Sequence, residues 1–393
     1  MSFSFAFDIA AAELDDELAV STASLDHLQL GDHTAPAAST SAIPHQDVPL
    51  DDLLATLPPL LSYTPVTVPL SPAPNTKTPR HATLLRRDLF DARFQILNQD
   101  ENPGDELPNG KGKGKGDTFV DEHTDLVKGV YEGGLKTWEC SLDLVDLLDQ
   151  RGFSPESDLD TERVRGKSIL EVGCGTAVPS CSLFARLMNE IRLSPTEEGA
   201  DKPRKTRIHL QDYNKQVLSL ITLPNLLLTY AQHLATPARA PEADEEPASD
   251  PQPGELDVTP EFLASFEALL ERENIELRFS EGDWAGMARA VRVAGEGERY
   301  DVVLTSETVY AVESLPALLD LLEAATARND DAGALCLVAC KRIYFGVGGG
   351  ELEFRRRVEE RGAEVEAVWG AGEGMGKSSG VGRTVMRVRW KGE

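Results

Sequence analysis

The sequence has few of the features expected of a secreted or membrane protein. No Lys or Arg precedes Lys77, and Asp8 interrupts the short apolar stretch near the N-terminus, so neither a secretory nor a mitochondrial targeting segment is expected there. No run approaches the roughly 18 apolar residues that a membrane-spanning helix needs. We therefore expect a soluble protein of the cytoplasm or the nucleus, including the nucleolus, with no membrane partner.

Cysteine is also scarce. The five cysteines are odd in number, and none stands in a CxxC pair or in the Cys/His spacing of a metal site. Cys174 has no histidine beside it that would form a nucleophile motif. These observations predict reduced thiols and no metal.

Basic residues are few relative to acidic ones. The 39 Lys and Arg against 66 Asp and Glu give a formal net charge of −27. Phosphate contacts need clustered Lys and Arg, so direct nucleic-acid binding is not expected, whereas a basic protein partner would suit the charge. The sequence contains no heptad pattern, and we expect a monomer.

The 393 residues are predicted to form a tail, a linker and one catalytic domain. Residues 1–80 carry 10 Asp or Glu against 2 Lys or Arg and little periodic apolar sequence, which predicts a disordered acidic tail. Residues 81–117 form a linker in which Lys alternates with Gly at 111–115, either a weak nuclear import patch or a solvated loop. The predicted domain spans 118–393, with loop insertions at about 194–206 and 236–260.

Within this domain, strand-like and helix-like segments alternate, which predicts β-α-β units, a mostly parallel sheet and a terminal antiparallel pair. The expected helices are Pro179–Leu193, Val217–Tyr230 and Leu315–Thr326. The expected strands are Val164–Val172, Ile208–Gln211, Ile275–Phe279, Asp301–Thr305, Leu335–Ala339, Val365–Trp369 and Thr384–Trp390.

A glycine-rich turn gives the sharpest local signal. Glu171–Ala177 (EVGCGTA) follows a predicted strand and precedes a predicted helix, and Gly173 and Gly175 remove side chains where the backbone must turn near a ligand. The turn completes neither the dinucleotide pattern G-x-G-x-x-G nor a P-loop. A plain strand-to-helix turn is the alternative.

Suitable polar groups follow the next three strands in order. Asp212 could accept both hydroxyl protons of a ribose, and Asp283 with Trp284 could bind and wall an adenine. Ser306 and Glu307 follow the fourth strand, at the edge where open α/β sheets place ligands. A solvated turn at Asp212 and a core position for Trp284 are the alternatives.

This order of motifs resembles the Rossmann-like, seven-stranded class I methyltransferases that depend on S-adenosylmethionine, over about residues 120–393. Longer strings narrow the resemblance to the protein-histidine N-methyltransferase family. These strings are Gly129–Ser141, Asp212–Lys215, Leu223–Asn225, Gly282–Trp284, Ser306–Tyr310 and Lys341–Gly350. The resemblance implies S-adenosylmethionine as cofactor and methylation of one histidine in large-subunit ribosomal protein number three, at the distal (tele) ring nitrogen.

The resemblance also implies a cofactor site that runs along these motifs. Trp138 and Glu139 would close over the methionine end, and a buried helix anchor is the alternative for Trp138. Ala177, where a third glycine often lies, is a departure from the general pattern that should still permit close helix packing. Carried over motif by motif, the site residues are Thr137, Trp138, Glu139, Cys140, Ser141, Gly173, Gly175, Asp212, Tyr213, Asn214, Asp283, Trp284 and Ser306.

Methyl transfer to a neutral imidazole needs positioning and tautomer selection rather than a strong base. Glu307 is our catalytic candidate, because a carboxylate that accepts from the nearer ring nitrogen leaves the farther nitrogen nucleophilic. Capping of the following backbone is the alternative role for Glu307.

Three other functions remain open at this point. A protein-lysine methyltransferase would share the fold, the upstream Trp and the strand-end acids. A non-catalytic escort of a ribosomal protein would suit the acidic charge, although the intact glycines and acids argue against a dead site. A small-molecule methyltransferase would share the fold but gains no support from the acidic surface.

Overall fold

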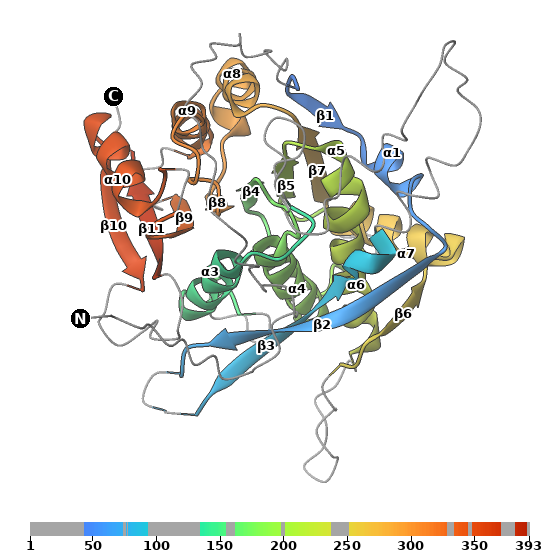
Figure 1. Ribbon diagram of the computed structural model, residues 1–393. Helices are drawn as coiled ribbons and strands as arrows, with labels where there is room; N and C mark the ends of the chain where they lie inside the picture. The colour runs from blue at the N-terminus through green and yellow to red at the C-terminus, as the bar shows by residue number, and fades with distance from the viewer. Residues whose placement is uncertain are drawn as a thin grey trace, which may run out of the picture.

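An eight-stranded sheet organises the chain, with the order β1-β7-β5-β4-β8-β9-β11-β10 (Figure 1). The computed structural model describes residues 43–73, 76, 78–92, 134–154, 162–197, 201–236, 251–327, 334–344, 348–370 and 382–390. Strands β7, β5, β4, β8 and β9 are parallel, whereas β1, β11 and β10 pair antiparallel with their neighbours. The bounds are β1 Gln46–Val48, β4 Ser168–Val172, β5 Thr206–Asp212, β7 Ile275–Glu281, β8 Val302–Ser306, β9 Leu335–Lys341, β10 Glu364–Trp369 and β11 Arg383–Arg389.

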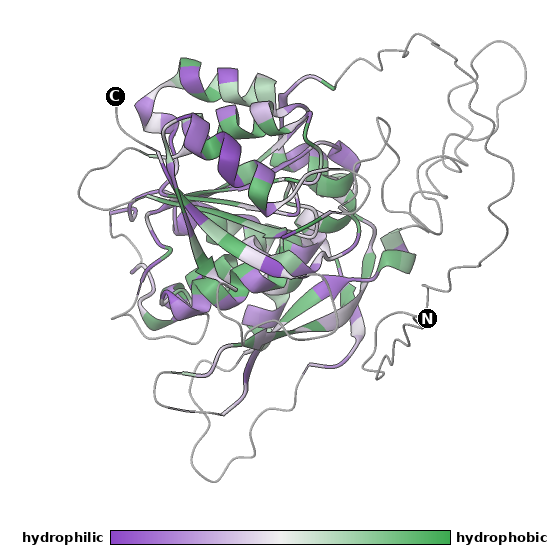
Figure 2. Cartoon of the chain, turned by 60° about the vertical axis from the view of Figure 1, so that its left-hand side comes forward, coloured by the Kyte–Doolittle hydropathy of each residue, from purple (hydrophilic) through white to green (hydrophobic). Residues whose placement is uncertain are grey.

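Helices cover both faces of this sheet (Figure 1). One layer contains α3 (Glu139–Gln150), α4 (Val178–Leu193) and the continuous helical stretch α5 (Lys215–Val217), η2 (Leu218–Thr222) and α6 (Leu223–Ala235), with α7 (Pro260–Arg272) beside it. The opposite layer contains α8 (Trp284–Ala294), α9 (Leu315–Ala325) and α10 (Glu351–Glu360). Coloured by hydropathy, the strands between the two layers are largely apolar (Figure 2).

Side chains alternate between the two faces of the sheet along each strand, and this divides the core into two clusters. Ile169 and Leu304 belong to the cluster under α3, α4 and α6, whereas Leu170 and Val303 belong to the cluster under α8 and α9. Successive residues of a strand point to opposite faces, so a strand covered on both sides is apolar throughout. This explains why β8 and β9 read as nearly continuous apolar runs in the sequence.

A second, three-stranded sheet lies on the α6 side of the molecule. It has the order β3-β2-β6, formed by β2 (Leu60–Leu70), β3 (Arg80–Arg87) and β6 (Gly254–Asp257). The short helix α1 (Leu50–Leu54) joins β1 to this sheet and buries Leu53.

The structure corrects the predicted tail, linker and second insertion. Residues 43–73 were expected in a disordered tail but form β1, α1 and β2, and β3 occupies the start of the predicted linker. The insertion expected at 236–260 contains β6 and the first residue of α7. Long-range pairing with β7 and with the rest of the chain stabilises these short segments, and composition carries no signal for it. Residues 1–42 and the Lys-Gly run at 111–115 lie outside the described residues.

The predicted strands and the terminal antiparallel pair are confirmed. Each observed strand from β4 to β11, apart from β6, overlaps its predicted range, and β10 pairs antiparallel with β11. The seven strands β7-β5-β4-β8-β9-β11-β10 are those expected, and β1 adds an eighth at one edge. The helices α7, α8 and α10 were not predicted.

One helical stretch among the described residues is long and apolar enough to cross a membrane, Lys215–Ala235. Of its most apolar window, 72% is buried inside the structure. It therefore packs as a core helix.

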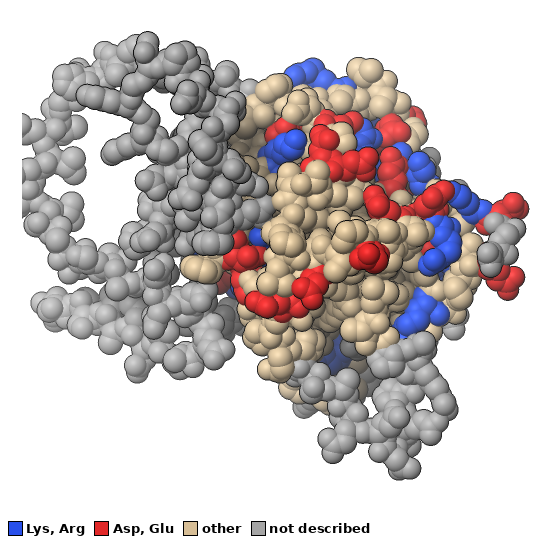
Figure 3. Space-filling model, turned by 90° about the vertical axis from the view of Figure 1, so that its right-hand side faces the viewer, with Lys and Arg blue, Asp and Glu red and all other residues tan. Residues whose placement is uncertain are grey.

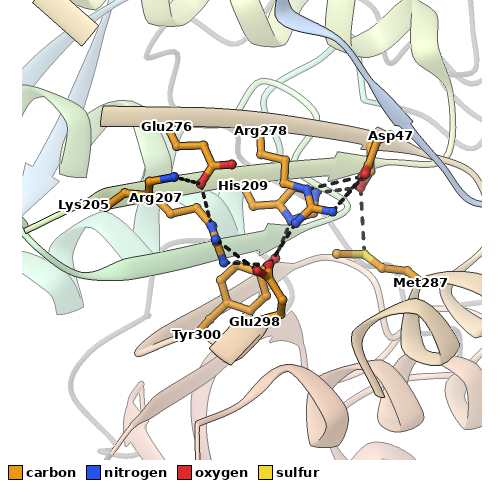
Figure 4. Close-up of polar contacts among 10 residues, drawn as sticks. Asp47, Lys205, Arg207, His209, Glu276, Arg278, Met287, Glu298 and Tyr300 are labelled. Atoms are coloured by element: carbon orange, nitrogen blue, oxygen red, sulfur yellow. Dashed lines mark hydrogen bonds and ion pairs between the residues drawn. The ribbon is translucent and has the colours of Figure 1, made fainter. Parts of the chain in front are cut away.

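Strand β1 is fastened to the sheet by a polar network (Figure 4). Arg278 on β7 contacts Asp47 on β1 at 2.9 Å and Glu298 at 3.1 Å. Beneath them, buried His209 lies between the Tyr300 hydroxyl at 2.6 Å and the Ser280 hydroxyl at 2.8 Å. Burial lowers the pKa of His209 well below its usual value, so its imidazole is neutral.

On the face of the molecule shown in Figure 3, Lys and Arg side chains intermingle with Asp and Glu.

Candidate active site

The glycine-rich turn after β4 is closely surrounded. Gly173 and Gly175 have φ values of +62° and +50°, a region that favours glycine. A Cβ atom on Gly173 would stand 2.7 Å from the Thr308 side chain, and one on Gly175 would stand 3.2 Å from Gly134. The turn therefore requires small residues at both positions, as the sequence predicted.

Asp212 ends β5 beside this turn. Its buried carboxylate accepts hydrogen bonds from the backbone N–H of Gly175 at 3.0 Å and of Asn214 at 3.3 Å. Asn214 is buried, and its side-chain Nδ2 has no hydrogen-bond partner. A buried donor without a partner is costly unless a ligand or water satisfies it. The pair therefore suits a ligand with hydroxyl groups.

Asp283 and Trp284 lie at the next strand end, after β7. Asp283 is the N-cap of α8, and its carboxylate accepts from the Gly286 N–H at 2.7 Å and from the His45 N–H at 3.2 Å. The Trp284 indole N–H donates to Gln211 Oε1 at 3.0 Å. The Asp283 carboxylate thus caps a helix, and its contact with an adenine stays a prediction. Half-buried Trp284 is held at the edge of the core.

Gln211 was not predicted as a site residue, yet it connects three motifs. Its Oε1 also accepts from the Gly173 N–H at 3.1 Å, and its Nε2 donates to the Gly282 carbonyl at 3.0 Å. The one feature of the sequence that could have indicated a role for Gln211 is its position beside Asp212. Gln211 fixes the glycine turn relative to Trp284.

The segment Ile43–Val48, here called the edge segment, also reaches this site. The Ile43 N–H donates to the Tyr213 hydroxyl at 3.1 Å, and the Ile43 carbonyl accepts from the Asp283 N–H at 2.9 Å. The edge segment therefore contacts two predicted site residues that lie far along the chain from it, which composition alone could not reveal.

The start of α3 forms the opposite border of the site. Thr137 contacts Thr176 at 3.2 Å between their hydroxyl oxygens, and Trp138 immediately precedes the helix. Trp138 is half-buried, and the Lys341 ammonium lies 5.3 Å from the ring centroid. Glu139 is exposed, and Ser141 is buried and donates to the Trp138 carbonyl at 2.6 Å.

Ser306 ends β8 and Glu307 follows it in a strained conformation. Glu307 has a φ of +56°, which costs energy for a residue with a side chain and recurs at functional sites. Its side chain is only 5% exposed. Glu307 Oε2 accepts from the Tyr344 hydroxyl, while Oε1 has no hydrogen-bond partner and lies 3.8 Å from Lys341 Nζ. Tyr344 and Lys341 belong to the Lys341–Gly350 string but were not singled out.

The pKa values of two groups beside Glu307 are raised. Burial, with the Glu307 carboxylate beside it, raises the pKa of the Cys140 thiol well above its usual value. Burial and the same carboxylate raise the pKa of the Tyr344 phenol. Both groups therefore stay protonated, so Cys140 is not a thiolate nucleophile.

Glu171, at the start of the glycine-rich motif, is completely enclosed. Its Oε2 accepts from the Ser180 N–H at 3.0 Å and from the Ser180 hydroxyl, and its Oε1 has no partner. Burial raises the pKa of Glu171 to about 7. Across the described part of the chain, no group of three His, Cys, Asp or Glu could hold a metal ion.

Comparison with known proteins places this chain in a family. No family model matches the chain. It is 33% identical over 288 residues to histidine protein methyltransferase 1 of Saccharomyces cerevisiae, covering 71% of this chain and 69% of that protein. It is 34% identical over 281 residues to the Schizosaccharomyces pombe protein of the same name, with the same coverage. The Bos taurus homologue is 32% identical over 61% of this chain and 52% of its own length.

Similarity to solved structures is much weaker. Magnesium protoporphyrin IX methyltransferase from Synechocystis, solved with bound SAH, is 11% identical to this chain and gives a TM-score of 0.32. The aligned region covers 63% of this chain and 80% of the Synechocystis chain. The two fungal relatives instead match at 33% and 34% identity over more than two thirds of their length. The chain therefore belongs to the histidine protein methyltransferase family.

Proposed function

We propose that this chain transfers a methyl group from S-adenosylmethionine to the distal (tele) ring nitrogen of a histidine in large-subunit ribosomal protein number three. It acts as a monomer on this basic partner, in the cytoplasm or the nucleus. The net charge of −27 supports a basic protein partner.

The glycine-rich turn and the end of β5 support a nucleoside cofactor. When bound, S-adenosylmethionine supplies an electrophilic methyl group on a sulfonium. Gly173 and Gly175 let the turn pack closely where side chains would clash with Thr308 and Gly134, and Asn214 Nδ2, which has no hydrogen-bond partner, supplies a donor beside the Asp212 carboxylate. These residues would hold the ribose, and Trp284 would wall the adenine.

The main observation in favour of histidine as the methyl acceptor is that one carboxylate oxygen of Glu307 has no hydrogen-bond partner. Tyr344 fixes Oε2 by hydrogen bonding, so Oε1 is a buried acceptor at the carboxyl edge of the sheet. An Nδ1–H of a substrate histidine would satisfy it and leave the lone pair on Nε2, the tele nitrogen. The same carboxylate would stabilise the positive charge that develops on the ring.

No strong base is needed in this reaction. A histidine with a pKa near about 6.5 is mostly neutral at cellular pH, so the residues need only select a tautomer, align the ring and exclude water. Glu307 is therefore assigned to orientation and charge stabilisation.

The proposal is tested by incubating the full chain with labelled S-adenosylmethionine and ribosomal proteins from cells that lack the enzyme. Mass spectrometry and amino-acid analysis then locate the label and separate the two methylhistidine isomers. Tele-methylhistidine in a single large-subunit protein is the expected result. Label on lysine would indicate a lysine rather than a histidine as the acceptor. Cofactor binding without transfer of label would favour the function of a non-catalytic escort of a ribosomal protein.

Glu307→Gln tests the role of the carboxylate. We expect cofactor binding to stay nearly intact while turnover falls by about 10² or more, because the developing charge loses its counterion. Glu366→Gln, which alters an exposed ion pair with Arg389 on β11, is the matched control. Unchanged turnover of Glu307→Gln would remove this residue from the mechanism.

A further inference from the structure

Lys341, the last residue of β9, lies at the centre of a charged cluster beside the candidate acceptor site. Its ammonium is 3.8 Å from Glu307 Oε1 and 3.8 Å from Glu139 Oε2, and 5.3 Å from the centroid of the Trp138 ring. It therefore faces the start of α3 and the turn after β8 at once. The Lys341 side chain is 23% exposed, so solvent screens it only in part.

Lys341 and Glu307 are connected through one side chain, because both form hydrogen bonds with the Tyr344 hydroxyl. The Lys341 N–H donates to the Tyr344 hydroxyl at 3.2 Å, and that hydroxyl donates to Glu307 Oε2. Lys341 Nζ approaches the other oxygen, Oε1, at a distance too long for a hydrogen bond but short enough for an ion pair. The Oε1 lone pairs thus remain available although the charge of Glu307 is compensated.

Among the described residues, Lys341 is the cation within ion-pair distance of Glu307, and other charged groups lie around the cluster. Arg383 on β11 contacts Glu139 at 3.7 Å, but its closest ion pair is with Asp143 on α3 at 2.7 Å. The thiol of Cys140 stays protonated because burial raises its pKa, so it adds no charge. More distant Glu351 and Arg355, of opposite sign, form an ion pair with each other at 3.2 Å.

We propose that Lys341 is a specificity-determining residue that makes the acceptor site accept a neutral imidazole and reject a lysine ammonium group. This inference rests on the proposed function. A Glu307 carboxylate without Lys341 would attract a lysine ammonium group or an imidazolium ion, whereas the Lys341 ammonium, 3.8 Å from Oε1, offsets much of that negative charge and leaves a hydrogen-bond acceptor. A substrate ammonium at Oε1 would also stand close to Lys341 Nζ, and like charges disfavour binding.

The same electrostatic effect acts on the substrate histidine. A fixed positive charge nearby disfavours the imidazolium form and lowers the pKa of the bound histidine. A larger fraction of the bound substrate histidine is then neutral at a given pH. Lys341 is therefore expected to act on the pH dependence and the choice of acceptor rather than on cofactor binding.

The test compares the wild type with Lys341→Met, which removes the charge and keeps an unbranched side chain, and with Lys341→Arg, which keeps the charge. Lys205→Met makes the same chemical change on an exposed residue of the His209 region, where Lys205 faces Glu276 at 3.5 Å. The substrates are purified large-subunit ribosomal protein number three and its variant with lysine at the methylated histidine. The readouts are kcat at saturating substrate against pH, methylhistidine, methyllysine and the affinity for S-adenosylhomocysteine.

We expect the rising limb of the pH profile of Lys341→Met to move upward by about 0.5 to 1 pH unit, while Lys341→Arg and Lys205→Met stay near the wild type. We also expect Lys341→Met to form methyllysine at least about tenfold faster than the wild type. All four proteins should bind S-adenosylhomocysteine alike.

An unshifted pH profile together with no gain of methyllysine would overturn the inference, even if turnover falls. Equal losses in Lys341→Met and Lys341→Arg would also overturn it, because they would indicate a purely structural role. Absence of methylhistidine with the wild type would instead contradict the proposed function, and the inference would fall with it. That outcome is visible before any variant is compared.

Discussion

Pro44 lies directly against Gly282, because a Cβ atom at position 282 would stand 2.3 Å from the Pro44 carbonyl oxygen. The contact brings the edge segment, Ile43–Val48, onto the strand end that carries Asp283. Hydrogen bonds from His45 to Asp283 and from Ile43 to Tyr213 continue it. The edge segment is therefore a wall of the candidate site, contributed by a part of the chain expected to be disordered.

Substitution Gly282→Ala should displace this wall. The added methyl group cannot avoid the Pro44 backbone, so we expect the affinity for S-adenosylhomocysteine to fall by about tenfold, or about 1.4 kcal/mol. Isothermal titration calorimetry would measure the loss, and amide hydrogen exchange of residues 43–48 would report the displacement.

Gly295→Ala is the control for this substitution. Gly282 and Gly295 have φ values of +94° and +83°, but nothing lies within 4 Å of a Cβ atom at Gly295. Both variants therefore carry backbone strain, and only one carries the clash. Equal affinities in the two variants would show that the edge segment does not border the cofactor site.

Glu171→Gln should remove a pH dependence of stability. Burial raises the pKa of Glu171 from 4.5 to about 7 in the folded protein, so the folded state holds this proton more tightly than the unfolded state does. The contribution to stability is complete below about pH 4.5 and is lost as pH rises through 7. Relative to the variant, the wild type should lose about 2 to 3 kcal/mol of unfolding free energy between about pH 5 and pH 8.

Denaturant unfolding of both proteins across this pH range would measure the difference. The amide introduced by Glu171→Gln can still accept from Ser180, so it imitates the protonated acid. Parallel pH profiles for wild type and variant would contradict the assigned pKa.

Arg186→Leu should destabilise the fold strongly. Arg186 and Glu190 are both buried within α4 and form an ion pair at 2.9 Å. Removal of the cation leaves a buried carboxylate, which costs about 3 to 5 kcal/mol. Arg292→Leu, which removes a half-exposed pair with Asp320 at 3.9 Å, should change stability by less than about 1 kcal/mol. Chemical denaturation would compare the two, and similar losses would refute the distinction.

Tyr344→Phe should lower turnover while leaving the cofactor affinity unchanged. The variant removes the hydrogen bond that fixes Glu307 Oε2, and a bond to a charged group is worth about 1.5 to 3 kcal/mol, so we expect a fall in kcat of about tenfold or more. Tyr230→Phe, which removes a hydroxyl that donates to Ser265 at 3.0 Å in another part of the molecule, should retain full turnover. Equal kcat values in the two variants would exclude an orienting role for Tyr344.

The parts of the site that the sequence predicted are those with a local signal. Gly173 and Gly175 follow an apolar strand, and Asp212 follows the next, so hydrophobic periodicity and turn chemistry together located them. The parallel order of the strands then placed their ends at one edge. This much follows from general rules for α/β sheets.

Residues whose role depends on tertiary contacts were missed. Lys341 reaches Trp138 and Glu139 from a distant part of the chain, and no local pattern marks a lysine at the end of a strand as part of a site. The three-residue strand β1 lies among prolines and acids, and its pairing with β7 outweighs that composition. Predictions from one sequence therefore failed where long-range packing decides the structure.

The position of β11 has a consequence for synthesis of the protein. This strand is the last of those described, yet it pairs with β9 on one side and β10 on the other. Until Arg383–Arg389 has been translated, β9 offers an unpaired edge in a nascent chain whose other parallel strands are already complete. Such an edge favours pairing with other chains. A premature stop that removes this strand should therefore give an aggregation-prone product rather than a slightly shortened enzyme.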